Sequence, residues 1–111
     1  SSMGWDPAEK QEQVFHADAR FVLVREPPAA PGNGTAPGQI IACCVFRFER
    51  EEGQNVLYCY ELQLLESARR NGLGRLLMQC LVDIGRRWRM SKIMLTVLRG
   101  IFAYPACLPI D

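Results

Sequence analysis

The sequence is poor in the residues and segments that several protein classes require. It has one histidine, His16, and its five cysteines contain no C-x-x-C pair, so we predict no metal site. No apolar run approaches the roughly 20 residues that cross a bilayer, and the first residues lack the basic and apolar parts of a signal peptide, so we expect neither a membrane span nor a leader. Four of the five cysteines lie in apolar segments, which favours a reducing compartment. The missing initiator methionine suggests a chain cut from a longer one.

Net charge is also nearly absent, because the formal charge is +1, and this gives no reason to expect direct contact with nucleic acid. The charges are nevertheless unevenly distributed. Residues 1–66 hold ten acidic and five basic side chains, whereas residues 67–99 hold eight basic side chains and one acidic one. This asymmetry suggests two ligands of opposite sign, although basic residues that merely solvate a helix would give the same pattern.

The length of 111 residues allows a single domain, residues 1–111. Near its start, Asp6 is a good helix cap, Pro7 suits a first helical position, and Glu9 completes a capping-box pattern. We therefore predict a surface helix that ends near His16.

Apolar, β-branched and aromatic residues then predict three strands joined as an antiparallel meander, at 20–25, 39–48 and 56–64. Residues 27–38 contain four prolines and three glycines, so we predict a flexible loop between the first two strands. Residues 49–54 are charged and contain a glycine, which predicts the second turn.

The second half of the chain has helical periodicity. Apolar residues recur at helical spacing over four turns, at Leu73, Leu76, Leu77, Cys80, Leu81, Ile84 and Trp88. Residues 92–98 predict a final strand. Because strand, helix and strand follow one another, we expect a βαβ unit whose two strands are parallel, and therefore an α+β fold with a mixed sheet. The basic residues of 86–92 fit the C-terminal end of this helix.

The segment Arg69–Arg75 (R-R-N-G-L-G-R) joins a predicted strand to this helix. Glycines let the backbone approach a ligand closely, and the N–H groups at a helix start bind anions. The spacing fits neither G-x-x-x-x-G-K-[ST] nor G-x-G-x-x-G. A glycine pair at a helix start also occurs without any ligand.

The pattern R-x-x-G-x-G, at Arg69, Gly72 and Gly74, resembles the acetyl-CoA signature of the GNAT superfamily of N-acetyltransferases. Residues 57–64 and 94–97, with Gly4-Trp5-Asp6, Glu9-Lys10 and Phe46-Arg47-Phe48, more narrowly resemble NatD enzymes, which acetylate the amino termini of histone four and histone two-A. The resemblance covers roughly residues 4–98, apart from the proline-rich insertion. It implies a partial GNAT-like domain, acetyl-CoA as co-substrate without a metal, histone tails beginning Ser-Gly-Arg-Gly as partners, a monomer, and a location in nucleus and cytoplasm.

The resemblance also implies roles for individual residues. The acetyl-pantetheine arm would bind the backbone of Leu62, Gln63 and Leu64. The pyrophosphate would bind at Arg70, Asn71, Gly72, Leu73, Gly74 and Arg75. On the peptide side, Tyr60, Thr96 and Trp5 would bind substrate, Glu49 would face a basic group, and Glu61 would deprotonate the incoming amine.

Elementary chemistry is compatible with these roles. An α-amino group has a pKa near 8, so a carboxylate or a bound water can remove its proton at modest cost. Since neighbouring strand residues point to opposite faces, we expect Tyr60 and Glu61 to do different jobs. Without the resemblance, Glu61 equally fits a solvent-facing carboxylate, Tyr58 and Tyr60 fit core aromatics, and Trp5 fits a cap on the surface helix.

The chain departs from the resembled family at both ends. A strand and a helix that would precede Gly4 are missing, and Ile101 stands where the family has a cofactor-binding Asn. Pro105 and Pro109 exclude a helix in residues 100–111, which we predict to be an irregular tail that leaves the last strand unpaired. Three functions remain open: an Nα-acetyltransferase, an inactive acetyl-CoA-binding or degenerate fragment, and an interaction module with a purely structural glycine turn.

Overall fold

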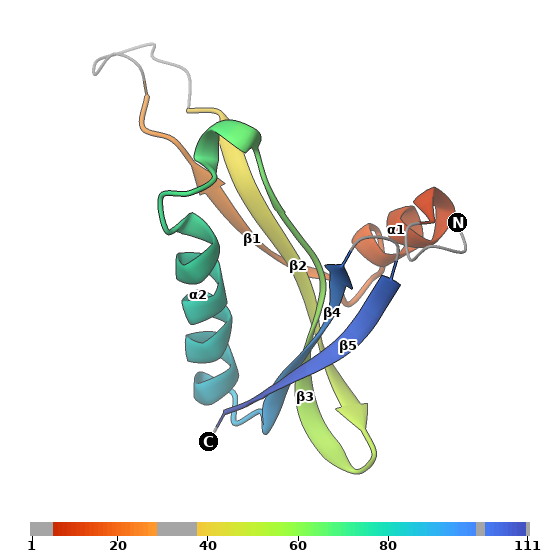
Figure 1. Cartoon of the computed structure of the whole chain (residues 1–111). Coiled ribbons are helices and arrows are strands. Elements are labelled where there is room, and N and C mark those ends of the chain that lie inside the picture. Colours follow the sequence, from red (N-terminus) through yellow and green to blue (C-terminus); the bar gives the residue numbers. More distant parts are fainter. Residues whose placement is uncertain (1–5, 29–37, 100–101, 111) are drawn as a thin grey trace.

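The computed structural model describes residues 6–28, 38–99 and 102–110, which form one mixed sheet and two α-helices (Figure 1). The helices are α1 (Pro7–Val14) and α2 (Leu73–Arg87), and a short 3-10 helix, η1, spans Glu66–Ala68. The strands are β1 (Arg20–Arg25), β2 (Ile40–Glu51), β3 (Gln54–Leu64), β4 (Lys92–Arg99) and β5 (Phe102–Pro109). None of the described helices has the length and apolar character needed to span a membrane.

The strands lie in the order β1–β2–β3–β4–β5. All neighbours are antiparallel except β3 and β4, which are parallel and joined by α2. The predicted meander, βαβ unit and mixed sheet are therefore confirmed. The turn between β2 and β3 is tighter than predicted, because Glu52 (φ 48°) and Gly53 (φ 79°) alone reverse the chain. Glu49 consequently lies within β2, where it is paired with Val56 of β3.

The hydrophobic core lies between the sheet and α2. Its buried members are Cys44, Phe46, Leu57, Cys59, Leu81, Ile93 and Ile110. The apolar stripe predicted for residues 73–88 supplies the helix side of this core, because Leu77 and Leu81 are fully buried. The cysteines do pack as small apolar residues here, with Sγ of Cys44 3.7 Å from Sγ of Cys59.

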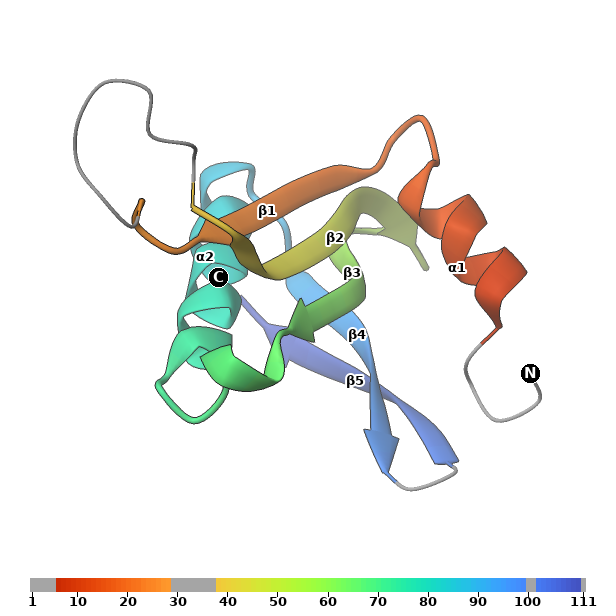
Figure 2. The same ribbon diagram turned by 90° about the horizontal axis from the view of Figure 1, so that it is seen from above.

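Helix α1 lies on the other side of the sheet from α2 (Figure 2). Its cap is the predicted one: the Asp6 carboxylate accepts the N–H groups of Ala8 at 3.0 Å and Glu9 at 3.3 Å. These backbone hydrogen bonds, with that to Glu9 foremost, lower the pKa of Asp6. Helix α1 buries none of its residues, and polar contacts of Lys10 with Tyr60 and Glu61 of β3 link it to the sheet.

The prediction of an irregular tail was wrong. Residues 102–109 form β5, which pairs antiparallel with β4 from Arg99–Phe102 to Lys92–Pro109, so the edge of β4 is covered. Prolines exclude a helix but are accepted in an edge strand, where one row of N–H groups has no partner to meet. After β5, Ile110 N–H donates to Ser91 O at 2.9 Å and its buried side chain enters the core. The tail is thus part of the fold.

Candidate functional site

A β-bulge in β3 shapes the candidate site. Val45 of β2 is paired with Glu61 and Phe46 with Cys59, so Tyr60 is an extra residue that faces no partner. Such a bulge breaks the regular alternation of side chains along a strand. Before and after the bulge, the polar side chains described below lie on the face of the sheet that points away from α2.

The bulge puts Tyr60 and Glu61 on the same face, which corrects our prediction that they point to opposite faces. The ring of Tyr60 stacks on Tyr58 at 4.4 Å between centroids. Lys10 of α1 lies 3.3 Å from Glu61 Oε2, and α1 is on the side of the sheet away from α2. Leu62, by contrast, packs against the core under α2. The alternation rule fails here because the bulge residue adds a position without adding a partner.

Tyr60 is held from three directions. Its hydroxyl donates to the Glu49 carboxylate, its ring stacks on Tyr58, and the guanidinium of Arg47 lies 3.9 Å from its ring centroid. Burial, and then the hydrogen bond to Glu49, raise the pKa of Tyr60 above its ordinary value, so the phenol is neutral near pH 7. The ring is therefore a fixed, uncharged wall of this face.

Glu49 is engaged more than the sequence suggested. Its Oε1 accepts from the Tyr60 hydroxyl and lies 3.5 Å from Nε of Arg47. Both contacts use the same oxygen. Among the described residues, Oε2 is the atom of Glu49 left for a cationic group of a ligand.

Glu61 lies beside α1 and is also held by two neighbours. Lys10 Nζ is 3.3 Å from its Oε2, and Gln63 Nε2 donates to its Oε1 at 3.1 Å. The side chain of Glu61 is 16% exposed, so it is sheltered but open to water on one side. Cys43 lies near it, and burial together with the Glu61 charge raises the pKa of the Cys43 thiol. Cys43 is therefore a poor nucleophile, and Glu61 is the candidate base of this face.

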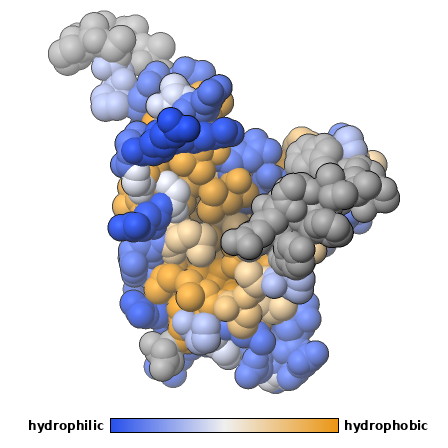
Figure 3. Space-filling model, in the orientation of Figure 1, coloured by the Kyte–Doolittle hydropathy of each residue, from blue (hydrophilic) through white to orange (hydrophobic). Residues whose placement is uncertain are grey.

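Beyond the bulge, β3 and β4 separate (Figure 1). Their register ends where Cys59 pairs with Leu95, although β3 continues to Leu64. Leu65 N–H donates to Ile41 O on the β2 side, and alternate N–H groups of a strand point to the same edge, so the N–H groups of Leu62 and Leu64 point to the edge that β4 has left. A hollow of about 450 Å³ lies here, lined by Leu62, Gln63, Leu64 and Arg69. Figure 3 shows apolar residues in the middle of the face between α2 and the β4–β5 hairpin, with hydrophilic residues around them.

The glycine turn leads from this hollow to α2. Arg70 (φ 68°) and Gly72 (φ 83°) both adopt left-handed conformations, and Gly72 caps the helix without a side-chain acceptor. Asn71 Oδ1 accepts the N–H of Leu73 at 3.3 Å. An added Cβ at Gly72 or Gly74 would meet no atom within 4 Å, so the helix start is open to a ligand. The helix start thus has first-turn N–H groups flanked by exposed arginines, and binding of an anion there stays a prediction.

The remaining predicted site residues are less connected. Thr96 is exposed on β4, opposite Pro105 of β5, and lies on the same face as Met94 and its partner Tyr58. Trp5 and Ile101 lie outside the described residues. Sequence reasoning assigned Lys10 no role, although Glu9-Lys10 is part of the resemblance, because the segment itself does not show which strand the lysine contacts. Arg47 and Tyr58 follow the period-2 alternation of their strands, so the sequence could have placed both of them on the face of Tyr60.

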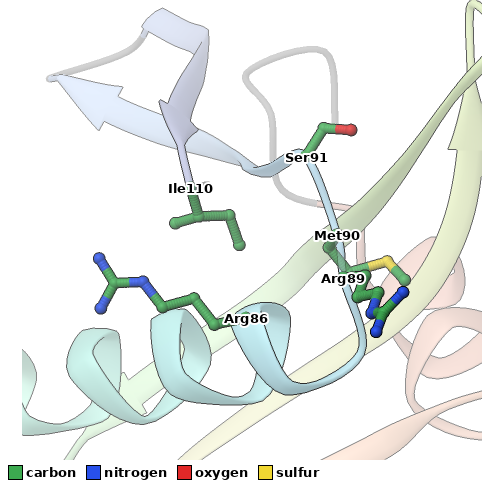
Figure 4. Close-up of a pocket in the computed structure, with 5 residues that line it drawn as sticks. All are labelled: Arg86, Arg89, Met90, Ser91 and Ile110. Atoms are coloured by element: carbon green, nitrogen blue, oxygen red, sulfur yellow. The ribbon is translucent and has the colours of Figure 1, made fainter.

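Of the other hollows among the described residues, two have charged side chains in their linings. One of about 290 Å³ lies beside α1 and is lined by Glu9, Glu12, Gln13, His16 and Arg47. The other, of about 520 Å³, lies at the C-terminal end of α2 and is lined by Arg86, Arg89, Met90, Ser91 and Ile110 (Figure 4). None of the predicted site residues lines the second hollow, and the helix dipole disfavours anions there. In the described parts of the chain, no group of three or more His, Cys, Asp or Glu side chains could hold a metal ion.

Known structures share this fold. The tetramutant of BH1408 from Bacillus halodurans is 18% identical, with a TM-score of 0.61 over 84% of this chain and 58% of that one. The NatC complex bound to Gag peptide and CoA is 14% identical, with a TM-score of 0.65 over 82% and 71%. NAA60 of Arabidopsis thaliana with a bisubstrate analogue is 13% identical, with a TM-score of 0.59 over 84% and 59%. The chain thus spans little more than half the length of two of these three.

The family model described as the acetyltransferase (GNAT) family matches residues 2–100, nearly the whole chain. The match includes the glycine turn, the bulged strand and both faces of the candidate site. The chain therefore belongs to the acetyltransferase (GNAT) family.

Proposed function

We propose that this protein transfers the acetyl group of acetyl-CoA to the amino terminus of a protein, and that its substrates are histone tails beginning Ser-Gly-Arg-Gly, as for NatD enzymes. Because histones would be its partners, the proposal includes activity in the nucleus and cytoplasm. The observation that carries the proposal is the separation of β3 from β4 beyond Cys59, which leaves strand amides beside an open helix start. Polar side chains suited to an amine lie on the other face.

The two faces suit two ligands. On one, the Leu62 N–H can face the thioester carbonyl, the Leu64 N–H can pair with an amide of the pantetheine arm, and the turn from Arg70 to Arg75 can hold a pyrophosphate. On the other, Tyr60, Glu49 and Glu61 line the approach of a peptide. The structural relatives include complexes with CoA and peptide and with a bisubstrate analogue, and this supports the same division here.

In the transfer, the amine nitrogen bonds to the acetyl carbon of the thioester, the carbon–sulfur bond breaks, and CoA leaves as a thiolate that takes a proton from water. The amine must be neutral to react, so Glu61 takes its proton, directly or through a water at its exposed side. The Leu62 N–H donates to the carbonyl oxygen, where negative charge develops. Tyr60, neutral and fixed, positions the peptide beside Glu61.

A cationic third residue of the peptide fits the charges on this face. Glu49 Oε2 has no partner among the described residues, and the hollow beside α1 adds the carboxylates of Glu9 and Glu12. Arg47 offsets part of this negative charge, so the preference for a basic residue is moderate. We expect Ser-Gly-Arg-Gly to be acetylated more efficiently than Ser-Gly-Ala-Gly.

The test combines calorimetric binding of acetyl-CoA with acetylation of the two peptides by wild type and Glu61→Gln. The proposal expects acetyl-CoA to bind, the arginine peptide to have the higher kcat/KM, and Glu61→Gln to lose about 10²–10⁴-fold in kcat with peptide affinity retained. Equal turnover of both peptides would remove the histone assignment and leave a broader acetyltransferase. Binding without turnover would establish an acetyl-CoA-binding protein instead.

A further inference from the structure

We propose that Lys10 is a positioning residue of the transfer reaction, which fixes the Glu61 carboxylate and the Tyr60 carbonyl at the β3 bulge. The inference rests on the proposed function, because it gives Glu61 the role of base. It concerns a residue of α1 that lies 50 positions before Tyr60, whose carbonyl it contacts. Lys10 itself need touch neither substrate.

The contacts of Lys10 are specific. Its Nζ donates to Tyr60 O at 2.8 Å and lies 3.3 Å from Glu61 Oε2. The side chains of Lys10 and Glu61 are 23% and 16% exposed, so this ion pair is more sheltered than a surface pair. One ammonium therefore ties the main chain of the bulge residue to the side chain of the next.

The bulge explains why such a contact is needed. A bulge residue has no pairing partner across the ladder, and beyond Cys59 there is no β4 register either. The carbonyl of Tyr60 would otherwise need water, and an unpartnered, sheltered carboxylate would be costly. By meeting both needs, Lys10 fixes the direction of Glu61 relative to the amides of the strand. General-base catalysis is sensitive to this direction, since a displacement of 1 Å can cost 10²-fold in rate.

A simpler role for Lys10 would be to fasten α1 to the sheet. Helix α1 buries none of its residues, so a polar contact matters for its attachment. The two roles differ in what they predict. If Lys10 only attaches α1 to the sheet, its loss changes peptide binding, because α1 borders the hollow lined by Glu9 and Glu12. A positioning residue changes kcat and does so only while Glu61 is present.

The experiment is a double-mutant cycle in the full chain, with Lys10→Met, Glu61→Gln and the double variant assayed for acetylation of a Ser-Gly-Arg-Gly peptide. Lys10→Arg tests rescue by a second cation. The control is Lys92→Met, which changes the only other lysine of the chain, on β4 opposite Val56. Peptide KM and calorimetric affinity for acetyl-CoA are measured for every variant.

We expect Lys10→Met to lower kcat by about 10-fold to 10²-fold and to change KM by less than about threefold. Lys10→Arg should recover most of kcat, Lys92→Met should match wild type, and Lys10→Met should have little further effect in Glu61→Gln. Fully additive effects of Lys10→Met and Glu61→Gln on kcat, or an effect of Lys10→Met on KM alone, would overturn the positioning role and show that Lys10 only attaches α1 to the sheet. Wild type that binds but never transfers acetyl would overturn the proposed function and this role with it, whereas an active wild type with unaffected Lys10→Met overturns this role alone.

Discussion

Gly72 offers the sharpest test of the cofactor site, because its conformation and its surroundings lead to different expectations. Its φ of 83° is left-handed, and an added Cβ would meet no protein atom within 4 Å. Alanine at this position therefore suffers conformational strain but no clash, at a cost of about 1–2 kcal/mol. The free turn of Gly72→Ala can escape the strain by rotating, and this rotation redirects the N–H groups of Leu73 and Gly74.

The strain at Gly72→Ala lowers the affinity for acetyl-CoA only if binding requires the turn to return to its left-handed conformation. Binding to N–H groups in their present directions must then restore the left-handed conformation, which weakens affinity by up to 1–2 kcal/mol, or about 5-fold to 30-fold in Kd. Isothermal titration of acetyl-CoA measures this directly. Thermal unfolding of the same samples shows whether the fold is intact.

Gly53→Ala is the matched control, because Gly53 is also left-handed (φ 79°), an added Cβ there meets no atom within 4 Å, and Gly53 lies in the β2–β3 turn outside the proposed cofactor site. Alanine at this position therefore carries the same strain of about 1–2 kcal/mol without redirecting the N–H groups of the helix start. Acetyl-CoA affinity should change by less than about threefold in Gly53→Ala. An unchanged Kd in Gly72→Ala, or equal losses in both variants, would show that the left-handed turn at Gly72 does not set the cofactor contacts.

Three further predictions concern the fold around the site. The pKa of Tyr60 is raised in the folded state, so its neutral phenol contributes fully to stability below the ordinary tyrosine pKa near 10, and this contribution is lost as the pH rises above that value. Ultraviolet titration of the folded protein should show one tyrosine that ionises at higher pH than the others, and this component should be absent in Tyr60→Phe. Ile110→Ala should cost about 2–5 kcal/mol in chemical denaturation, and a smaller loss would mean that the tail is not anchored. Since an added Cβ at Gly85 would lie 2.2 Å from Ile110 Cδ1, Gly85→Ala should be more favourable in the Ile110→Ala background than in wild type, and equal effects would contradict this packing.

Local signals in the sequence were sufficient for most of the architecture. The cap at Asp6, the helical spacing from Leu73 and the β-branched and aromatic content of β1, β2 and β3 are local features, and these elements were predicted correctly. The tail was not, because its pairing partner is β4. Whether Pro105 breaks regular structure depends on which edge its missing N–H faces, and this is a property of the sheet rather than of the segment.

The sequence allowed us to name the residues of the candidate site, but not to predict how the bulge in β3 arranges them. The glycine turn carries its own signal, since a left-handed conformation at Gly72 requires that residue type. The bulge carries none: the segment V-L-Y-C-Y-E-L-Q-L alternates as regularly as an unbroken strand, and the extra residue appears only when β3 is paired with β2. Assigning opposite faces to Tyr60 and Glu61 was therefore a reasonable inference from the wrong register.

This one irregularity connects the two halves of the proposed chemistry. Inserting Tyr60 without a partner puts its ring on the face of Glu61, so that a peptide positioned by one reaches the other. The same insertion leaves the Tyr60 carbonyl for Lys10, which brings a cation to Glu61. Beyond it, β3 is no longer in register with β4, and the N–H groups of Leu62 and Leu64 face the hollow. A variant that restored regular pairing here, such as one with Tyr60 deleted, should therefore lose both cofactor binding and turnover while keeping the sheet.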